Sequence, residues 1–289
     1  MPDNQPFSSK NRIISTATSA DLREITHFLS QNYRIHQHLD WFNAPEWIGQ
    51  QPFLVEKYQQ QIYAILLTAP EVPGATWIRL FCIKNSGMLE PTWQRLLDHA
   101  ILSIKSMGVK TLAALGSSRW FTTLLSGTKF EQTNNIVSLE KKYSSMSVSN
   151  NPSQIEIRPM CGDDLPEVAQ IDHAAFAPIW QNSLESLKKA YQQQGVATVA
   201  VRNQKIVGYQ ISTWWSFHAH LARLAVQPEQ QGQHIASMLV GDLLTRLLAK
   251  EITHVTVNTQ ADNHSSLAVY SKFGFQQTGT VIPVYQRAL

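Results

Sequence analysis

The pattern of hydrophobic and polar positions repeats along the chain. Near the start of each half, a capping residue precedes apolar positions at helical spacing, at 18–29 and 162–172, which predicts an amphipathic helix. Two apolar runs separated by a polar turn follow at 53–67 and at 198–212, and each predicts a β-hairpin. Longer helices with Leu and Ile at 3.6-residue spacing are then expected at about 92–107 and 234–250.

Matching segments of the two halves lie at a nearly constant offset of 143 to 145 residues. The matched pairs are Asp21-Leu22 with Asp164-Leu165, Arg79-Leu80 with Arg223-Leu224, and FEQT (130–133) with FQQT (275–278). A constant offset favours duplication of one unit with the order β-α-β-β-β-α-β-α-β. The predicted fold class is therefore α/β, with two tandem domains, each a mixed central sheet flanked by helices.

A polar, turn-rich stretch separates the two repeats. A chain of 289 residues exceeds what one hydrophobic core usually serves, which also favours two domains. We expect a first domain over 1–145, a linker over 146–154 and a second domain over 155–289.

Composition and charge argue against some classes of protein but do not identify a function. Hydrophobic residues make up 43% of the chain and charged residues 16%, as in a folded protein, and the net charge of +3 comes from scattered Lys and Arg. This scatter argues against a nucleic-acid partner, while a mildly positive surface suits a polyanionic cofactor. The two cysteines are too few for a disulfide framework, the first twelve residues lack the apolar core typical of a signal peptide, and no apolar run reaches the length of a membrane span. We expect a cytoplasmic protein without a membrane partner, and the composition indicates no particular oligomeric state.

The second half contains a candidate anion site. An apolar strand over 222–226 leads through a turn containing Gly232 into the helix predicted from 234. The free backbone N–H groups at such a helix start, together with the helix dipole, favour a pyrophosphate.

Two motifs in this region resemble those of the GNAT (GCN5-related N-acetyltransferase) superfamily. Gln231, His234 and Ala236 fall on the defining positions of the pyrophosphate motif Q/R-x-x-G-x-G/A, with His234 in place of the middle glycine. A residue with a Cβ there is costly if the backbone adopts positive φ. About 30 residues later, the second motif has Asn, then Tyr seven positions on, then GF, and here these are Asn263, Tyr270 and Gly274-Phe275.

The resemblance implies a tandem GNAT arrangement and an acetyltransferase that moves an acetyl group from acetyl-CoA, as cosubstrate, to a primary amine by direct attack. It implies that backbone groups near Leu224 and Val226 hold the pantetheine arm, that an N–H near Leu224 or Ala225 stabilises the oxyanion, and that the amides of 231–237 bind the pyrophosphate. The cofactor-binding residues expected on this basis are Leu224, Ala225, Val226, Gln231, Gly232, Gln233, His234, Ile235, Ala236, Ser237 and Asn263. No metal-ligand spacing is present.

The catalytic residues expected are Tyr270 and His220. Tyr270 would protonate the departing thiolate, and Asn263 would cap the helix that carries it. His220 and His218 share one strand face and have the intrinsic pKa of a general base, and His220 is the favoured candidate, with Glu229 or a water-mediated transfer as alternatives. Trp180, Trp214 and Trp215 are candidates to line a pocket for a small-molecule or peptide amine acceptor. A catalytically idle acyl-CoA-binding regulatory or interaction protein is the alternative function.

The first half resembles a GNAT unit that has lost its cofactor motif. Glu90 and Pro91 lie near the expected helix start, where a carboxylate would repel phosphate, and the position matching Tyr270 is Leu125 or Ser126. We therefore expect a structural role for this half, and no chemistry for its histidine- and aromatic-rich segment at 36–47.

Overall fold

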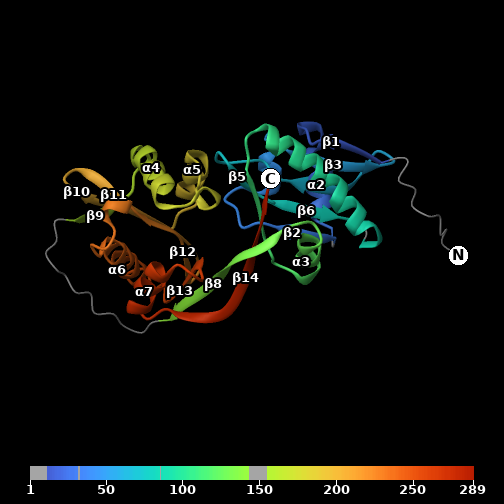
Figure 1. Cartoon of the computed structure of the whole chain (residues 1–289). Helices are drawn as coiled ribbons and strands as arrows, with labels where there is room; N and C mark the ends of the chain where they lie inside the picture. The colour runs from blue at the N-terminus through green and yellow to red at the C-terminus, as the bar shows by residue number, and fades with distance from the viewer. Residues whose placement is uncertain (1–11, 32, 85, 143–154) are drawn as a thin grey trace. The chain divides into compact units, whose positions relative to one another are not determined.

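The computed structural model describes residues 12–31, 33–84, 86–142 and 155–289. The described elements form two compact units (Figure 1). Unit 1 comprises Met1–Gln132 and Tyr285–Leu289, and unit 2 comprises Thr133–Val284. The predicted linker at 146–154 lies outside the described residues.

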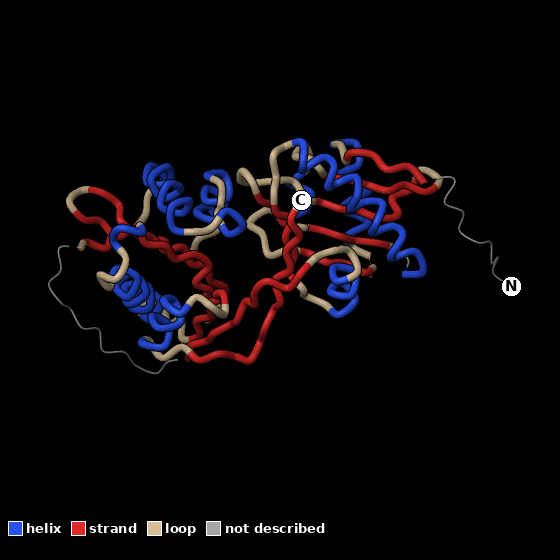
Figure 2. Tube along the Cα trace, viewed as in Figure 1, coloured by secondary structure: helices blue, strands red, loops and turns tan. Residues whose placement is uncertain are grey.

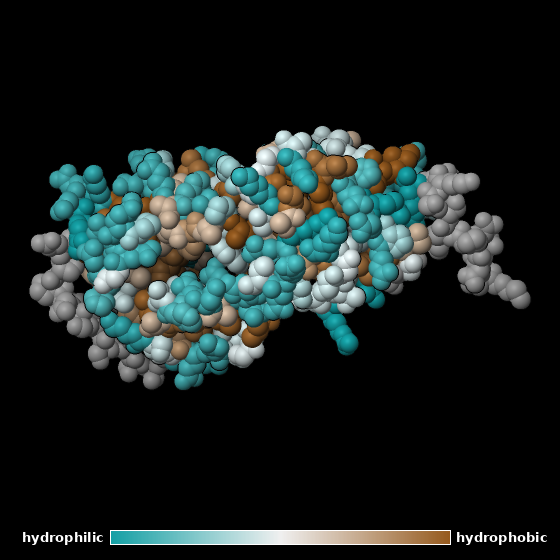
Figure 3. All heavy atoms as spheres, viewed as in Figure 1, coloured by the Kyte–Doolittle hydropathy of each residue, from teal (hydrophilic) through white to brown (hydrophobic). Residues whose placement is uncertain are grey.

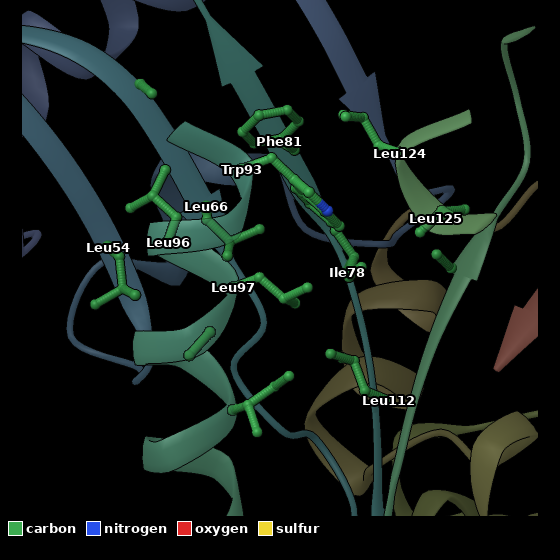
Figure 4. Packing of buried hydrophobic residues seen from close by; sticks show 14 of the residues in the cluster. Leu54, Leu66, Ile78, Phe81, Trp93, Leu96, Leu97, Leu112, Leu124 and Leu125 are labelled. Atoms are coloured by element: carbon green, nitrogen blue, oxygen red, sulfur yellow. The ribbon is translucent and has the colours of Figure 1, made fainter. Parts of the chain in front are cut away.

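Unit 1 contains a five-stranded sheet of order β1-β3-β4-β6-β2 and a separate group of strands, β5-β7-β14. Its elements are β1 (Arg12–Thr16), α1 (Leu22–Leu29), β2 (Arg34–Gln37), β3 (Phe53–Tyr58), β4 (Gln61–Leu67), β5 (Ala75–Trp77), β6 (Leu80–Ile83), α2 (Leu89–Ser106), β7 (Thr111–Leu115) and α3 (Arg119–Ser126). One face of α2 packs on the strands, with Trp93, Leu96 and Leu97 buried against Leu66 and Phe81 (Figure 4). The predicted hairpin and long helix are confirmed, with the helix starting at Leu89.

Unit 2 has the strand order β14-β8-β13-β12-β11-β10-β9. Its elements are β8 (Glu131–Lys142), β9 (Glu156–Pro159), α4 (Leu165–Ala175), α5 (Leu184–Gln192), β10 (Val196–Arg202), β11 (Lys205–Trp215), β12 (His218–Val226), α6 (Ile235–Leu248), β13 (His254–Gln260), α7 (His264–Lys272) and β14 (Gln276–Ala288). The α4–α5 pair covers one face of the sheet and α6 and α7 cover the other (Figure 2). The predicted mixed α/β class, with helices flanking mixed sheets, is confirmed.

The predicted capping segments start helices in both units. The carboxylate of Asp21 accepts a hydrogen bond from the Thr18 N–H at 2.8 Å, just before α1. In unit 2 the carboxylate of Asp164 accepts one from the Cys161 N–H at 2.8 Å, just before α4. Equivalent local chemistry therefore begins both repeats.

The last strand of each repeat extends into the other unit. Most of β8, the last strand of the first repeat, lies in unit 2, where it pairs antiparallel with β13 and buries Val137 and Leu139 in that unit's core. The end of β14, the last strand of the second repeat, lies in unit 1, where the Leu289 N–H donates to the Lys110 carbonyl at 3.0 Å. The structural division after Gln132 therefore differs from the boundary expected near 145–155. The reason is that strand partners, which no local pattern specifies, decide which core each terminal strand joins.

Candidate functional site

Strands β12 and β13 separate part of the way along unit 2. Their parallel pairing runs from His218–His254 to Leu221–Val257, whereas β12 stays paired with β11 as far as Val226–Gly208. A β-bulge inserts Ala222 into β12 at the point of separation, and bulges bend and twist the strand that carries them. Among the described strands, the edge of β12 over 222–226 has no partner on the β13 side, so its backbone groups are available to a ligand.

The turn after β12 is held by side chains of unit 2. Gln231 donates from its side-chain amide to the Val226 carbonyl at 3.1 Å, which anchors the turn to the strand end. The guanidinium of Arg202, at the end of β10, donates to the side chains of Gln230, at 2.7 Å, and of Gln233. The turn is therefore shaped before any ligand binds.

Helix α6 begins at a left-handed residue. His234 caps the helix with φ 62° and ψ 10°, the conformation that favours glycine. The first bond into the helix is donated by the Met238 N–H to the His234 carbonyl at 3.0 Å, so the amides of Ile235, Ala236 and Ser237 precede it. These amides and the positive end of the helix dipole form an anion site. The neighbouring surface of unit 2, between the α4–α5 pair and α6, is hollowed, with hydrophobic residues in the hollow (Figure 3).

The residues of the second motif lie on the α7 side of β12. Asn263 caps α7 as predicted, because its side-chain oxygen accepts from the Ser266 N–H at 3.1 Å. Tyr270 is 4% exposed and packs in the same hydrophobic cluster as Leu221 and Leu224 of β12. Burial raises the pKa of the Tyr270 phenol above its ordinary value, and a hydrogen bond with Ser266 opposes the shift. The phenol is therefore protonated at neutral pH and can act only as a donor of its proton.

His220 is held in one tautomer by β13. Its Nδ1 lies 2.8 Å from the Thr256 hydroxyl oxygen, and that hydroxyl donates its own proton to the Ala219 carbonyl at 3.3 Å. The hydroxyl must therefore accept from His220, which places the proton on Nδ1 and leaves Nε2 with its lone pair. Burial lowers the pKa of His220, so the ring is neutral at neutral pH. A neutral imidazole with an unprotonated Nε2 is a competent general base.

The other candidates spread over the same face of unit 2. His218 lies on the same face of β12 as His220, as predicted, and stacks on Trp215 with 5.8 Å between ring centroids. Trp214 is 37% exposed and Trp215 is 58% exposed. Glu229 lies in the turn after β12 and lines a separate cavity of about 680 Å³ formed by the start of α4, the β10–β11 turn and residues 227–230.

A buried ion pair beside β12 was not predicted from the sequence. Arg223 donates from Nε and Nη2 to the two carboxylate oxygens of Asp172 at 2.7 and 2.8 Å, and from Nη2 to the Trp180 carbonyl at 2.6 Å. Asp172 also accepts from the Tyr209 hydroxyl and from the Asn182 N–H, the latter at 2.8 Å. The pair therefore ties the segment between α4 and α5 to the bulged part of β12. A signal was present in the sequence, since Arg223 interrupts an apolar strand and Asp172 follows Ile171 in an amphipathic helix.

The corresponding edge in unit 1 is occupied. Strand β6 pairs with β4 on one side and with β2 on the other, over Arg34–Gln37 and Ile83–Leu80. The ring of His36 in β2 is fully buried, with Nδ1 3.0 Å from the Ser117 hydroxyl and Nε2 3.2 Å from the Ile78 carbonyl. Leu80 and Cys82 match Leu224 and Val226 of the second repeat, so β2 holds the edge that stays open in unit 2.

Comparison with known proteins agrees with this geometry. Residues 165–275 match the model of the acetyltransferase (GNAT) family. The chain carries a GNAT acetyltransferase domain. No curated protein matches the chain significantly. No helix among the described residues is long and apolar enough to cross a membrane.

Solved structures extend the similarity over both units of the chain. A GCN5-related N-acetyltransferase from Sphaerobacter thermophilus is 14% identical, with a TM-score of 0.60 over 96% of this chain and 95% of its own. A tandem GNAT protein from the clavulanic acid biosynthesis pathway is 11% identical, with a TM-score of 0.62 over 96% and 98%. A glucosamine N-acetyltransferase region of a fungal multi-domain β-N-acetylglucosaminidase is 14% identical, with a TM-score of 0.65 over 97% of this chain and 38% of its own. At these identities the similarity establishes the tandem GNAT fold.

Proposed function

We propose that unit 2 transfers the acetyl group of acetyl-CoA to a primary amine by direct attack of the amine on the thioester. The observation that carries the proposal is the opening of β12 from β13 beyond Leu221, beside the free amides at the start of α6. An open strand edge next to an anion site matches a ligand with an extended amide arm and a pyrophosphate.

The backbone of β12 would orient the cosubstrate. The groups of Leu224 and Val226 on the open edge would bond the pantetheine amides, as a neighbouring strand would, and the amides of 231–237 would bond the pyrophosphate. An N–H at Leu224 or Ala225 would stabilise the carbonyl oxygen as it gains charge. This arrangement holds the thioester beside the bulge at Ala222, on the same strand as His220.

Two side chains would manage the protons. The unprotonated Nε2 of His220 would take the proton of the attacking amine, because Thr256 holds the other proton on Nδ1. The phenol of Tyr270, on the opposite side of β12, would give its proton to the departing thiolate. The bond from the amine nitrogen to the acetyl carbon forms as the carbon–sulfur bond breaks, and no covalent intermediate with the protein is needed.

The Arg223–Asp172 pair would position the acceptor side. Because Arg223 bonds the Trp180 carbonyl, it fixes the segment between α4 and α5 beside the bulge. This segment and the exposed tryptophans of β11 would contact the part of the acceptor that does not react. Aromatic side chains there suit an acceptor with an apolar or cationic group next to its amine.

The first test is calorimetric titration of the full chain with acetyl-CoA, with desulfo-CoA and dephospho-CoA as comparison ligands. We expect one site per chain, because β2 occupies the matching edge of unit 1. Two sites would contradict the cofactor-free interpretation of unit 1, and no binding would contradict the proposed function. A panel of primary amines, including glucosamine because of the fungal structure, then tests transfer. Binding without transfer to any amine would favour the idle acyl-CoA-binding alternative.

A pair of variants tests the role given to His220. Thr256→Val keeps the branched shape but removes the acceptor of the Nδ1 proton, so kcat should fall about tenfold, which corresponds to the loss of roughly one hydrogen bond. Thr256→Ser keeps the hydroxyl and should retain most of the activity. Equal rates for the two variants would remove the tautomer from the mechanism.

A further inference from the structure

Three ionisable side chains form a chain of hydrogen bonds across three strands of unit 2. His218 of β12 and His254 of β13 lie with their Nδ1 atoms 2.8 Å apart. The Nε2 of His254 lies 2.9 Å from Oε2 of Glu140 in β8. The other carboxylate oxygen of Glu140, Oε1, is 3.2 Å from the Lys142 ammonium.

The carboxylate sets the direction of every proton in this chain. The pKa of Glu140 is lowered by a hydrogen bond from Lys142, which has the larger effect, and by one from His254. The carboxylate is therefore ionised and can only accept hydrogen bonds. His254 must then donate from Nε2, which leaves its Nδ1 as an acceptor when the ring is neutral. His218 donates to that Nδ1 and keeps the lone pair on its own Nε2. The free acceptor at the end of the chain is therefore Nε2 of His218.

The free end of this chain lies on the same strand face as the proposed base. His218 and His220 are two positions apart in β12, so their side chains project from one face of the strand. His220 is partly buried and bonded to Thr256, whereas His218 is exposed. A proton taken up by His220 must leave before the next turnover, and the exposed neighbour lies on its way to solvent.

We propose that Glu140 and His254 hold His218 in the tautomer that relays the acceptor's proton from His220 to solvent. The proton passes from Nε2 of His220, through a water molecule, to Nε2 of His218. Water then removes that proton from Nε2 of the exposed His218, while the Nδ1 proton of His218 stays in its hydrogen bond to His254. His220 and His218 each gain and lose one proton at Nε2, so both return to their starting tautomers. The inference rests on the proposed function, since it takes His220 as the base.

The carboxylate of this hydrogen-bonded chain comes from the first repeat. Glu140 belongs to β8, the last strand of the first repeat, and β8 reaches β13 because it lies in unit 2. The second repeat by itself contains the two histidines but lacks the carboxylate. The tautomer of His218 is therefore set by a residue from the first repeat.

The first experiment measures the hydrogen bonds without any substrate. In the full chain labelled with ¹⁵N-histidine, NMR should show protonated Nδ1 in His218, protonated Nε2 in His254, and a coupling between their Nδ1 atoms across the hydrogen bond. The opposite tautomers, or two histidines without coupling, would overturn the relay whatever the activity of the protein.

The second experiment uses acetyl-CoA and the best amine of the panel. In dilute buffer, Glu140→Gln should lower kcat about tenfold, less than the roughly 10²–10⁴-fold expected for a group that takes the proton directly, while KM for acetyl-CoA stays constant. Added imidazole should restore most of the lost rate by removing the proton itself. Ser138→Ala, two positions away on the same face of β8, should change neither value.

The outcomes separate the two proposals. If wild-type protein transfers acetyl groups but Glu140→Gln has the wild-type kcat, or a low kcat that imidazole does not raise, the relay is wrong and the proposed function stands. If the wild type transfers nothing to the amines, the proposed function fails, and the histidine spectra decide about the hydrogen-bonded chain.

Discussion

His234 is a residue with a Cβ in a conformation that favours glycine, and His234→Gly should therefore stabilise unit 2. The left-handed conformation costs a non-glycine residue about 1–2 kcal/mol, and His234 is solvent-exposed, so its ring contributes little packing that would be lost. Glycine adds conformational entropy to the unfolded chain, which costs about 0.4–1 kcal/mol. The difference leaves a net stabilisation of about 0.5–1 kcal/mol.

Scanning calorimetry of the full chain can measure this change. For a unit of this size, the gain corresponds to an increase of about 1–4 °C in Tm of the transition that belongs to unit 2. Gln233→Gly is the control, because Gln233 is not in the left-handed region; glycine there adds entropy to the unfolded chain and removes the bond from Arg202, so it should lower stability by at least about 0.5–1 kcal/mol. A lower Tm for His234→Gly, or the same shift in both variants, would refute the assignment of strain to this residue.

Four further changes test the site and its support. Ala236→Glu places a carboxylate at the start of α6 and should weaken acetyl-CoA binding about tenfold or more by calorimetry, and an unchanged affinity would count against the loop assignment. Tyr270→Phe should lower kcat by about 10²-fold with little change in acetyl-CoA affinity, and a wild-type rate would remove Tyr270 from the acid role. Asp172→Asn leaves Arg223 without its buried counter-charge and should destabilise unit 2 by about 3–5 kcal/mol in urea unfolding, with partial recovery on adding Arg223→Met. Burial lowers the pKa of His36 from 6.5 to about 4, so as pH falls the unfolded state binds a proton before the folded state does. The stability that the neutral ring contributes is fully present above pH 6.5, and up to about 3 kcal/mol of it is lost as pH falls to 4. His36→Asn should flatten this dependence of the free energy of unfolding on pH.

Local patterns in the sequence determined the elements and the candidate cofactor site. Hairpins and helices follow from apolar periodicity over a few residues, and the caps at Thr18 and Cys161 follow from contacts three positions apart. The run from Gln231 to Ser237 is likewise contiguous, so its placement at a helix start was predictable. The capping role of Asn263 was predicted for the same reason.

Contacts between distant positions were decided only by the tertiary structure. Arg223 and Asp172 are 51 positions apart, and Glu140 and His254 are 114 apart, so neither pair leaves a periodic signal. The sequence shows that a left-handed conformation would be costly at His234, but it does not show that His234 adopts it. The structure has this conformation, in a turn that Arg202 and Gln231 hold in place. A local sequence pattern specifies which segments become strands, but strand pairing depends on how all the strands are buried together. For this reason only the structure shows that β2 pairs along the edge of β6 in unit 1 and that β8 pairs with β13 in unit 2.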